Sequence, residues 1–197
     1  MVKRVFDLIF SSLLIILLSP LFLIISLMIV IDSKGGIVFR QKRVGKNNHD
    51  FDIYKFRTMH TGSDKKGLLT VGMKDERVTR TGYFLRKYKL DELPQLFNVL
   101  IGNMSFAGPR PEVRRYVEMY NSEQLHVLDV KPGITDYASI DFANENELLA
   151  KSANPEDTYT SIIMPAKLKL NLKYIREQSF LTDMKIIFRT IRKIFLE

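Results

Sequence analysis

Two adjacent carboxylates are the residues of this sequence whose chemistry is most specific. Asp91 and Glu92 directly follow a basic stretch, and the residues from Asp91 to Leu100 predict a helix that these two acids open. Helix-start N–H groups, the helix dipole and nearby cations favour the charged carboxyl, so we expect Asp91 to be ionised. An ionised carboxylate can attack phosphorus, and a carboxylate pair suits Mg²⁺ held jointly with substrate phosphates. The alternative is the acidic first turn that many helices have.

A rigid arginine loop follows this pair. Gly108 lets the backbone approach a ligand closely, and Pro109 and Pro111 stiffen the chain on either side of Arg110. A guanidinium presented in this way can clamp a phosphate, and a helix that begins at Pro111 would add N–H donors for an anion. A rigid turn with a solvated arginine is the other interpretation.

A third group of polar residues lies in a short strand. The segment from Phe51 to Arg57 alternates apolar and polar residues, which predicts a strand with Lys55 and Arg57 on one face. An earlier strand from Ile37 to Gln41 would complete a hairpin with it. The basic face would meet phosphates or lipid head groups, or it would be an ordinary solvent-exposed face.

The composition excludes several kinds of chemistry. The chain has 197 residues, a net charge of +8 and a pI near 9.6, which indicates an anionic partner: a phosphorylated substrate, an anionic lipid or a nucleic acid. There is no cysteine for disulfides or thiolate metal sites, and His49, His60 and His126 lack the spacing of zinc ligands. We therefore expect neither a redox enzyme nor a zinc enzyme. No nucleic-acid-binding motif accompanies the charge, so no nucleic-acid partner is expected.

An uncharged, mostly apolar segment from Leu8 to Ile31 is long enough to enter a bilayer. A cleaved signal peptide is the alternative, but the run is too long and no small-x-small cleavage site follows it. Ser19 and Pro20 lie at its middle. Pro20 removes a hydrogen-bond donor to the Ile16 carbonyl, and Ser19 can turn its hydroxyl back to a carbonyl one turn earlier. Both residues predict a bend or break in the helix.

Positive charge lies on both flanks of this segment. The flanking cations are Lys3, Arg4, Lys34, Arg40, Lys42 and Arg43. Because cations favour the cytoplasmic side of a membrane, both ends are expected there. Residues 1–34 are therefore predicted to form a re-entrant membrane helix that enters and leaves through one leaflet. A single kinked helix that spans the bilayer is the alternative, since proline is tolerated in such helices.

Residues 35–197 are predicted to form an α+β domain at the cytoplasmic face, with the small β-hairpin, a majority of helices, and amphipathic helices at the membrane interface. The final helix, from Leu181 to Leu196, has basic residues opposite an apolar face. That face carries Met184, Ile187, Phe188, Ile191 and Phe195. Such a helix lies in the membrane interface, or it packs on a core with its basic face in solvent.

Five motifs, taken in order and at these distances, resemble the bacterial sugar transferase family of monotopic phosphoglycosyl transferases. The resemblance covers residues 5–134 and a stretch near 179–189. The motifs are Ser19-Pro20, Tyr54-Lys55-Phe56-Arg57-Thr58-Met59, Leu90-Asp91-Glu92-Leu93-Pro94-Gln95-Leu96-Phe97-Asn98, Gly108-Pro109-Arg110-Pro111 and Lys131-Pro132-Gly133-Ile134-Thr135.

The resemblance implies transfer of a phosphosugar from a UDP-sugar to undecaprenyl phosphate, a first membrane step of glycoconjugate synthesis at the cytoplasmic face of the bacterial inner membrane. It implies that Asp91 attacks the β-phosphate, expels UMP and carries the phosphosugar until the lipid phosphate accepts it. Mg²⁺ at Asp91 and Glu92 would offset the phosphate charge, and Glu92 would hold the metal or manage a proton. The implied phosphate or uridine contacts are Arg57, Arg86, Arg110 and, more weakly, Lys55.

One stretch departs from the family pattern. Many members continue after the fifth motif with Gly-Trp, where this chain has Asp136 and Tyr137, and residues 143–169 do not align. We expect this stretch to shape the sugar pocket, so the sugar and the glycan pathway are not predicted, nor is the oligomeric state. The alternative function is a non-catalytic, membrane-anchored, lipid-binding scaffold of the same fold, which would not need both carboxylates.

Overall fold

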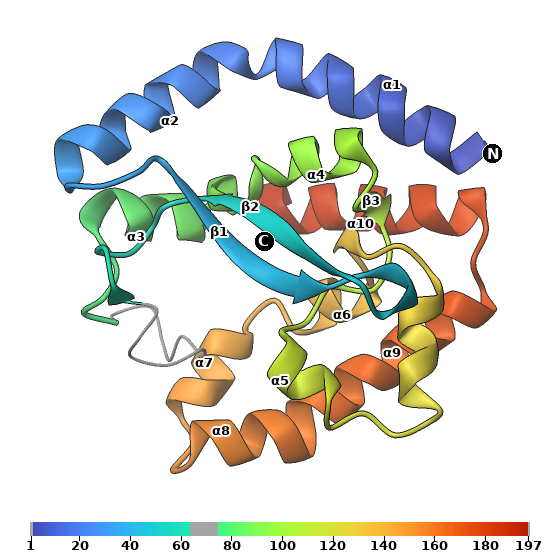
Figure 1. Ribbon diagram of the computed structural model, residues 1–197. Helices are drawn as coiled ribbons and strands as arrows, with labels where there is room; N and C mark the ends of the chain where they lie inside the picture. Colours follow the sequence, from blue (N-terminus) through green and yellow to red (C-terminus); the bar gives the residue numbers. More distant parts are fainter. Residues whose placement is uncertain (1, 64–74, 197) are drawn as a thin grey trace.

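A bent pair of helices lies along one side of the molecule, over a β-hairpin and a helical layer (Figure 1). The computed structural model describes residues 2–63 and 75–196. In chain order, the elements are α1 (Val2–Leu17), α2 (Ser19–Asp32), β1 (Val38–Val44), η1 (Lys46–Asn48), β2 (Asp50–Phe56), α3 (Arg80–Lys87), η3 (Leu90–Glu92), α4 (Gln95–Ile101), β3 (Ser105–Ala107), α5 (Arg114–Val117), η4 (Gln124–Asp129), β4 (Gly133–Thr135), α6 (Tyr137–Asp141), α7 (Glu145–Ala150), α8 (Pro155–Thr158), the π-turn η5 (Tyr159–Ile163), α9 (Met164–Arg176) and α10 (Phe180–Leu196).

The expected α+β class is confirmed, since the described residues form mostly helices and two small sheets. Strands β1 and β2 form the predicted antiparallel hairpin, in a register that pairs Val38 with Phe56 and Val44 with Asp50. Strands β3 and β4 form a short parallel pair that the sequence analysis did not anticipate. In Figure 1 the hairpin crosses the middle of the molecule, between the bent helix pair and helices α5 to α9.

The predicted bend at Ser19 and Pro20 is confirmed. Helices α1 and α2 meet at an angle of 60°. Ser19 Oγ donates a hydrogen bond of 2.7 Å to the Ile16 carbonyl, which is the carbonyl that Pro20 leaves without a donor. Within the described residues, no helix taken alone has the length and apolarity to cross a membrane, whereas the bent pair has them jointly.

The helix pair leaves many apolar side chains exposed, and α1 buries polar ones. Its outward surface is apolar, with Ile16 71% exposed, Leu23 72% and Ile31 77%. Its inward surface in α1 is polar, since Asp7 and Ser11 are buried against the rest of the protein. Water does not favour this arrangement, because it leaves apolar side chains hydrated and buries polar ones.

Polar contacts hold α1 onto the layer beneath it. Lys3 Nζ forms an ion pair of 2.8 Å with Asp183 of α10, and both groups contact the Tyr174 hydroxyl. Arg4 donates to the Val99 and Leu100 carbonyls at the end of α4, at 2.6 and 2.8 Å. A cation at a helix C-terminus satisfies carbonyls that have no partner within the helix. Lys3 and Arg4 therefore attach α1 to α10 and α4, in addition to supplying positive charge beside the apolar segment.

The other end of the pair is fastened by Arg57. Its guanidinium donates to the carbonyls of Ser33 at 2.7 Å and Lys34 at 2.6 Å, and more weakly to that of Ile29 at 3.4 Å. Arg57 is only 8% exposed. This structure therefore gives Arg57 a structural role at the C-terminus of α2, and a substrate contact for it stays a prediction.

The predicted helix boundaries fail at two places near the arginine loop and the carboxylate pair. Pro111 does not begin a helix, because α5 starts three residues later at Arg114. The carboxylates do not open the helix that ends at Ile101, because α4 starts at Gln95 after a separate 3₁₀ turn. Neither of the two expected helix starts therefore supplies dipole stabilisation at the carboxylates or at the arginine loop.

The final helix matches its prediction within one residue at its start. Phe188 and Ile191 are 69% and 50% exposed, while Met184 and Ile187 are half-buried and Ile186 is fully buried. The helix therefore both packs on the core and leaves bulky apolar side chains outside. The predicted position of the Phe195 side chain lies outside the described residues.

We expect Arg57→Gln to lower the free energy of unfolding by about 2 kcal/mol, because it removes charge-assisted bonds from buried carbonyls. Denaturant unfolding of the detergent-solubilised chain measures the change. Arg40→Gln is the matched control, because Arg40 lies on the exposed face of β1. Equal destabilisation by the two variants would contradict the anchoring role of Arg57.

Candidate active site

The carboxylate pair lies in a turn that the backbone of Lys89 creates. Lys89 has a φ of 56°, the left-handed conformation that a residue with a side chain adopts at a cost of about 1 kcal/mol. This conformation ends the path of α3 and starts the 3₁₀ turn η3, which carries Asp91 and Glu92. The side chain of Asp91 points into the protein and the residue is 8% exposed.

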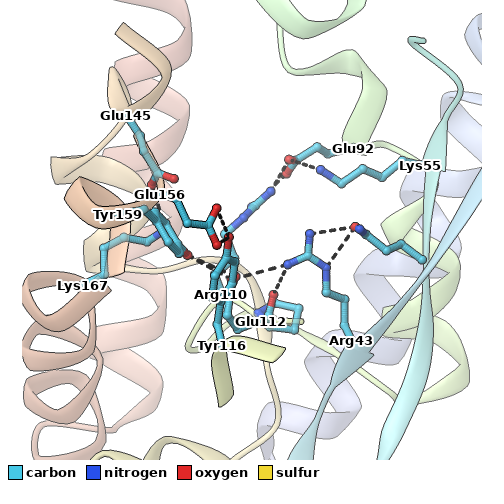
Figure 2. Close-up of polar contacts among 12 residues, drawn as sticks. Arg43, Lys55, Glu92, Arg110, Glu112, Tyr116, Glu145, Glu156, Tyr159 and Lys167 are labelled. Atoms are coloured by element: carbon cyan, nitrogen blue, oxygen red, sulfur yellow. Dashed lines mark hydrogen bonds and ion pairs between the residues drawn. The ribbon is translucent and has the colours of Figure 1, made fainter. Parts of the chain in front are cut away.

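Two cations hold Glu92. Lys55 Nζ, from β2, lies 2.9 Å from Glu92 Oε1. The Arg110 guanidinium contacts both carboxylate oxygens, with a distance of 3.1 Å to Oε2. Figure 2 shows Lys55 and Arg110 converging on Glu92. A bidentate arginine contact fixes both the position and the orientation of a carboxylate.

The two neighbouring carboxyls are shifted in opposite directions. Burial opposes the ionisation of Glu92, but the charges of Arg110 and Lys55 outweigh it and hold the pKa of Glu92 well below its usual range. Burial raises the pKa of Asp91; the Lys55 charge lowers it and the Glu92 charge raises it further. The different surroundings of the two carboxyls therefore shift their pKa values in opposite directions, although the residues are adjacent in the chain.

The expectation that the surroundings of Asp91 favour its charged form is contradicted by this raised pKa. It counted stabilisation by a helix start that is absent here, and it left out burial, which sequence alone does not reveal. Within the described residues, no hydrogen bond reaches the Asp91 carboxylate from another residue. Asp91 is thus the member of the pair whose oxygens are not already engaged by a neighbouring side chain within the described residues.

Arg86 is brought to the Asp91 side of the site by a close helix–strand contact. Its Nε donates 2.8 Å to Thr58 Oγ1, just beyond β2, and its charge acts on the Asp91 carboxyl. The contact requires Gly82 in α3, because a Cβ there would lie 2.0 Å from the Thr58 carbonyl oxygen. Of the predicted substrate contacts, Lys55, Arg86 and Arg110 therefore gather at the pair, while Arg57 fastens α2.

Some residues of the site were missed by sequence reasoning. Gln95 is fully buried, and neither polar atom of its side chain has a hydrogen-bond partner among the described residues. It lies four residues after Asp91 in the same sequence motif, a position that could have identified it. Asp136 is also fully buried and contacts the Arg110 backbone.

The stretch that departs from the family pattern packs beside the arginine loop. Tyr159 donates to both carboxylate oxygens of Glu112 at 3.1 Å, and Lys167 pairs with Glu145 at 2.8 Å (Figure 2). Arg43 of the hairpin approaches the same Glu112 at 3.5 Å. Glu112 therefore joins helices α7 to α9 to the loop that holds Arg110.

The fit of Mg²⁺ to the site differs between the two carboxylates. Glu92 has both oxygens engaged by cations, whereas the Asp91 carboxylate has none of its oxygens hydrogen-bonded within the described residues. The described residues contain no group of three or more histidine, aspartate or glutamate side chains that could enclose an ion. Mg²⁺ here would therefore need oxygens from substrate phosphates as well as Asp91, which is the usual way that proteins bind it.

The whole chain, residues 1–197, matches the family described as "Bacterial sugar transferase". The chain belongs to the bacterial sugar transferase family. This membership confirms the resemblance found from the five motifs. It also agrees with a site in which lysine and arginine surround a carboxylate pair, since these side chains bind phosphate groups well.

Curated relatives of this sugar transferase family member act on different sugars. It is 39% identical, over 98% of its length, to a UDP-N-acetylgalactosamine-undecaprenyl-phosphate N-acetylgalactosaminephosphotransferase of Aeromonas hydrophila. It is 40% identical over 98% of its length to a UDP-glucose:undecaprenyl-phosphate glucose-1-phosphate transferase of Klebsiella pneumoniae, and 36% identical over its whole length to the Escherichia coli enzyme of that name. The alignments cover 43%, 40% and 40% of those relatives, so this chain spans about two fifths of their length.

We expect Asp91→Asn to stabilise the protein at pH 7, because a carboxyl with a raised folded-state pKa destabilises the folded state wherever it is ionised. The gain should shrink as pH falls through the folded-state pKa and vanish below about pH 4, the unfolded value. Unfolding in detergent at pH 7 and pH 4 measures it.

Glu92→Gln is the matched variant, and its effect should have the opposite sign. The lowered pKa of Glu92 contributes stability above its unfolded value, and this contribution is lost as pH falls through the folded value. Removing the carboxylate leaves Lys55 and Arg110 unpaired, so we expect a loss of about 2 kcal/mol at pH 7. Shifts of the same sign in the two variants would contradict the division between the carboxyls.

Proposed function

We propose that this chain transfers a phosphosugar from a UDP-sugar to undecaprenyl phosphate, through a covalent intermediate on Asp91 and with release of UMP. The observation that carries the proposal is the contrast within the carboxylate pair. Glu92 is ion-paired through both oxygens, whereas Asp91 is buried and has a carboxylate without hydrogen bonds in the described structure. The names of the relatives support the two substrates, with undecaprenyl phosphate common to all three.

In the first half-reaction, a carboxylate oxygen of Asp91 attacks the β-phosphorus of the UDP-sugar. A bond forms between that oxygen and phosphorus, and the bond from phosphorus to the bridging oxygen breaks. UMP leaves with the bridging oxygen and its electron pair. Lys55 and Arg86, whose charges act on the Asp91 carboxyl, offset the negative charge of the diphosphate.

In the second half-reaction, a phosphate oxygen of undecaprenyl phosphate attacks the same phosphorus. The bond to Asp91 breaks, the carboxylate is restored, and the product is an undecaprenyl diphosphate sugar. Each half-reaction forms one phosphorus–oxygen bond and breaks another, so no further reactant is needed. Glu92 keeps Lys55 and Arg110 in place during both steps, since its oxygens are engaged by them.

Mg²⁺ is the cofactor that we propose, held by Asp91 and by oxygens of the diphosphate. It would neutralise phosphate charge and polarise the transferred group. The ion pairs of Glu92 with Lys55 and Arg110 leave it less suited to the second ligand position that the sequence predicts. A role for Glu92 as a ligand of Mg²⁺ stays a prediction.

We further propose that the bent helix pair is re-entrant in the cytoplasmic membrane. The start of α1 is fastened to the domain by Lys3 and Arg4, and the end of α2 is fastened to the same domain by Arg57. A helix that crossed a hydrocarbon core of about 30 Å would leave its two ends on opposite sides. The cations at both ends favour the cytoplasmic face, where the soluble UDP-sugar and the lipid phosphate can meet at one site.

Release of UMP from the full chain in detergent, with Mg²⁺, undecaprenyl phosphate and a panel of UDP-sugars, tests the reaction. We expect Asp91→Asn to lower the turnover at least roughly a thousand-fold, as removal of a covalent nucleophile does. Asp129→Asn is the control, because Asp129 is an exposed carboxylate far along the chain from the pair. Mass spectrometry after incubation with donor alone should find a phosphosugar on the peptide that contains Asp91.

A phosphosugar at another residue, or unchanged turnover of the Asp91 variant, would contradict the proposed nucleophile. The scaffold alternative predicts a different result: the wild-type chain would bind undecaprenyl phosphate and release no UMP from any donor. The panel also identifies the sugar, which the helices beside Glu112 are proposed to select.

Labelling of single cysteines tests the topology, because the chain contains no natural cysteine. We expect Val2→Cys and Gly36→Cys to be equally protected from an impermeant thiol reagent in intact cells and equally labelled after the cells are opened. The two positions flank the bent pair. Labelling of the early position alone from outside would show a spanning helix and reject the re-entrant proposal.

A further inference from the structure

Asp136 divides its carboxylate between two separate parts of the chain. It follows β4 and caps the start of α6, where Oδ1 accepts the Ser139 N–H at 2.6 Å. Its other oxygen, Oδ2, accepts the N–H of Arg110 at 3.1 Å. Asp136 is fully buried, so these contacts replace the water that an ionised carboxylate would otherwise bind.

The second contact concerns the one N–H group of the Pro109-Arg110-Pro111 run. Proline has no N–H, so Arg110 supplies the only backbone donor in these three residues. Capping of α6 does not require this bond, because a single serine, threonine or asparagine oxygen caps a helix. The carboxylate at position 136 therefore does something beyond capping.

The chain on either side of this bond is held closely. Gly108 N–H donates to the Thr135 carbonyl and Gly133 N–H donates to the Pro109 carbonyl, both at 3.0 Å. The two segments cross so closely that a Cβ on Gly133 would lie 2.2 Å from Gly108 N. The Asp136 contact extends this pairing by one residue, to Arg110.

The side chain of Arg110 leaves this fixed backbone toward Glu92 and also contacts the Ile134 carbonyl at 3.5 Å. Charges alternate along the resulting row: Asp136, Arg110, Glu92 and Lys55. Each member thus has an opposite charge beside it, which lowers the cost of gathering four charges at a partly buried site.

We propose that Asp136 is a positioning residue for the transfer reaction: by holding the Arg110 backbone, it directs the guanidinium onto Glu92 and the phosphate groups beside it. The inference rests on the proposed function for its effect on turnover.

Asp136→Ser separates the two contacts, because serine still caps α6 but has no second oxygen for Arg110. Asn121→Ser is the matched control, since the exposed Asn121 accepts the Gln124 N–H with its side chain, as a helix cap does, and lies outside the proposed site. We expect Asp136→Ser to lower kcat/KM about tenfold, as small misplacements of binding groups do, and the control to leave it unchanged.

A double-mutant cycle with Arg110→Lys distinguishes positioning from a general loss of stability. If Asp136 acts through the guanidinium of Arg110, then Asp136→Ser should cause little further loss of kcat/KM in the Arg110→Lys background. Losses that simply multiply would overturn the inference, and so would wild-type kcat/KM in the Asp136→Ser variant.

Hydrogen exchange provides a readout that does not depend on activity. The amide of Arg110 should exchange about tenfold faster in Asp136→Ser than in the wild-type chain, and its exchange rate should be unchanged in Asn121→Ser. Unchanged exchange in Asp136→Ser would overturn the positioning role by itself. A wild-type chain that released no UMP would instead reject the proposed function, while the exchange result would still decide whether Asp136 holds the loop.

Discussion

The ion pairing of Glu92 is the constraint on which the site depends. Lys55 comes from the hairpin and Arg110 from the loop after β3, and both reach a carboxylate in the turn before α4. Three separate segments are thereby joined at one charged group. Because Glu92 takes up both cations directly, its neighbour Asp91 keeps a carboxylate with no hydrogen-bond partner in the described structure. The two carboxylates therefore differ because Glu92 is fully ion-paired and Asp91 is not.

The bent helix pair is likewise attached to the domain by charged and polar side chains. Its apolar surface faces outward, and its polar contacts face the domain, through Asp7 in the middle of α1 and through cations at both ends. Asp7 accepts from Ser105 Oγ and the Phe106 N–H in β3, the strand that leads into the arginine loop. Strand β3 therefore contacts the proposed membrane segment and leads directly into the arginine loop of the proposed active site.

The sequence predicted features that depend on neighbouring residues. Pro20 removes a specific donor and Ser19 can replace it, so the bend follows from local chemistry alone. Alternation in the hairpin and helical spacing in α10 are likewise local patterns. Each was found because its cause lies within a few residues of its effect.

Features that depend on distant contacts were not predictable in this way. The carbonyls that Arg57 contacts lie 23 to 28 residues away, and Asp7 meets its partners about a hundred residues along the chain. The helix expected to start at Asp91 starts at Gln95 instead, after a 3₁₀ turn that follows the left-handed backbone of Lys89, a conformation that lysine rarely adopts. The raised pKa of Asp91 depends on burial, which only the assembled fold determines.

Four successive residues at the end of β2 contact four different parts of the molecule. Lys55 meets the carboxylate turn, Phe56 packs in the core beneath α2, Arg57 fastens the C-terminus of α2, and Thr58 accepts from Arg86 of α3. Removal or insertion of one residue here would move every side chain by one place and reverse its direction. The length of this run is therefore constrained by all four contacts at once.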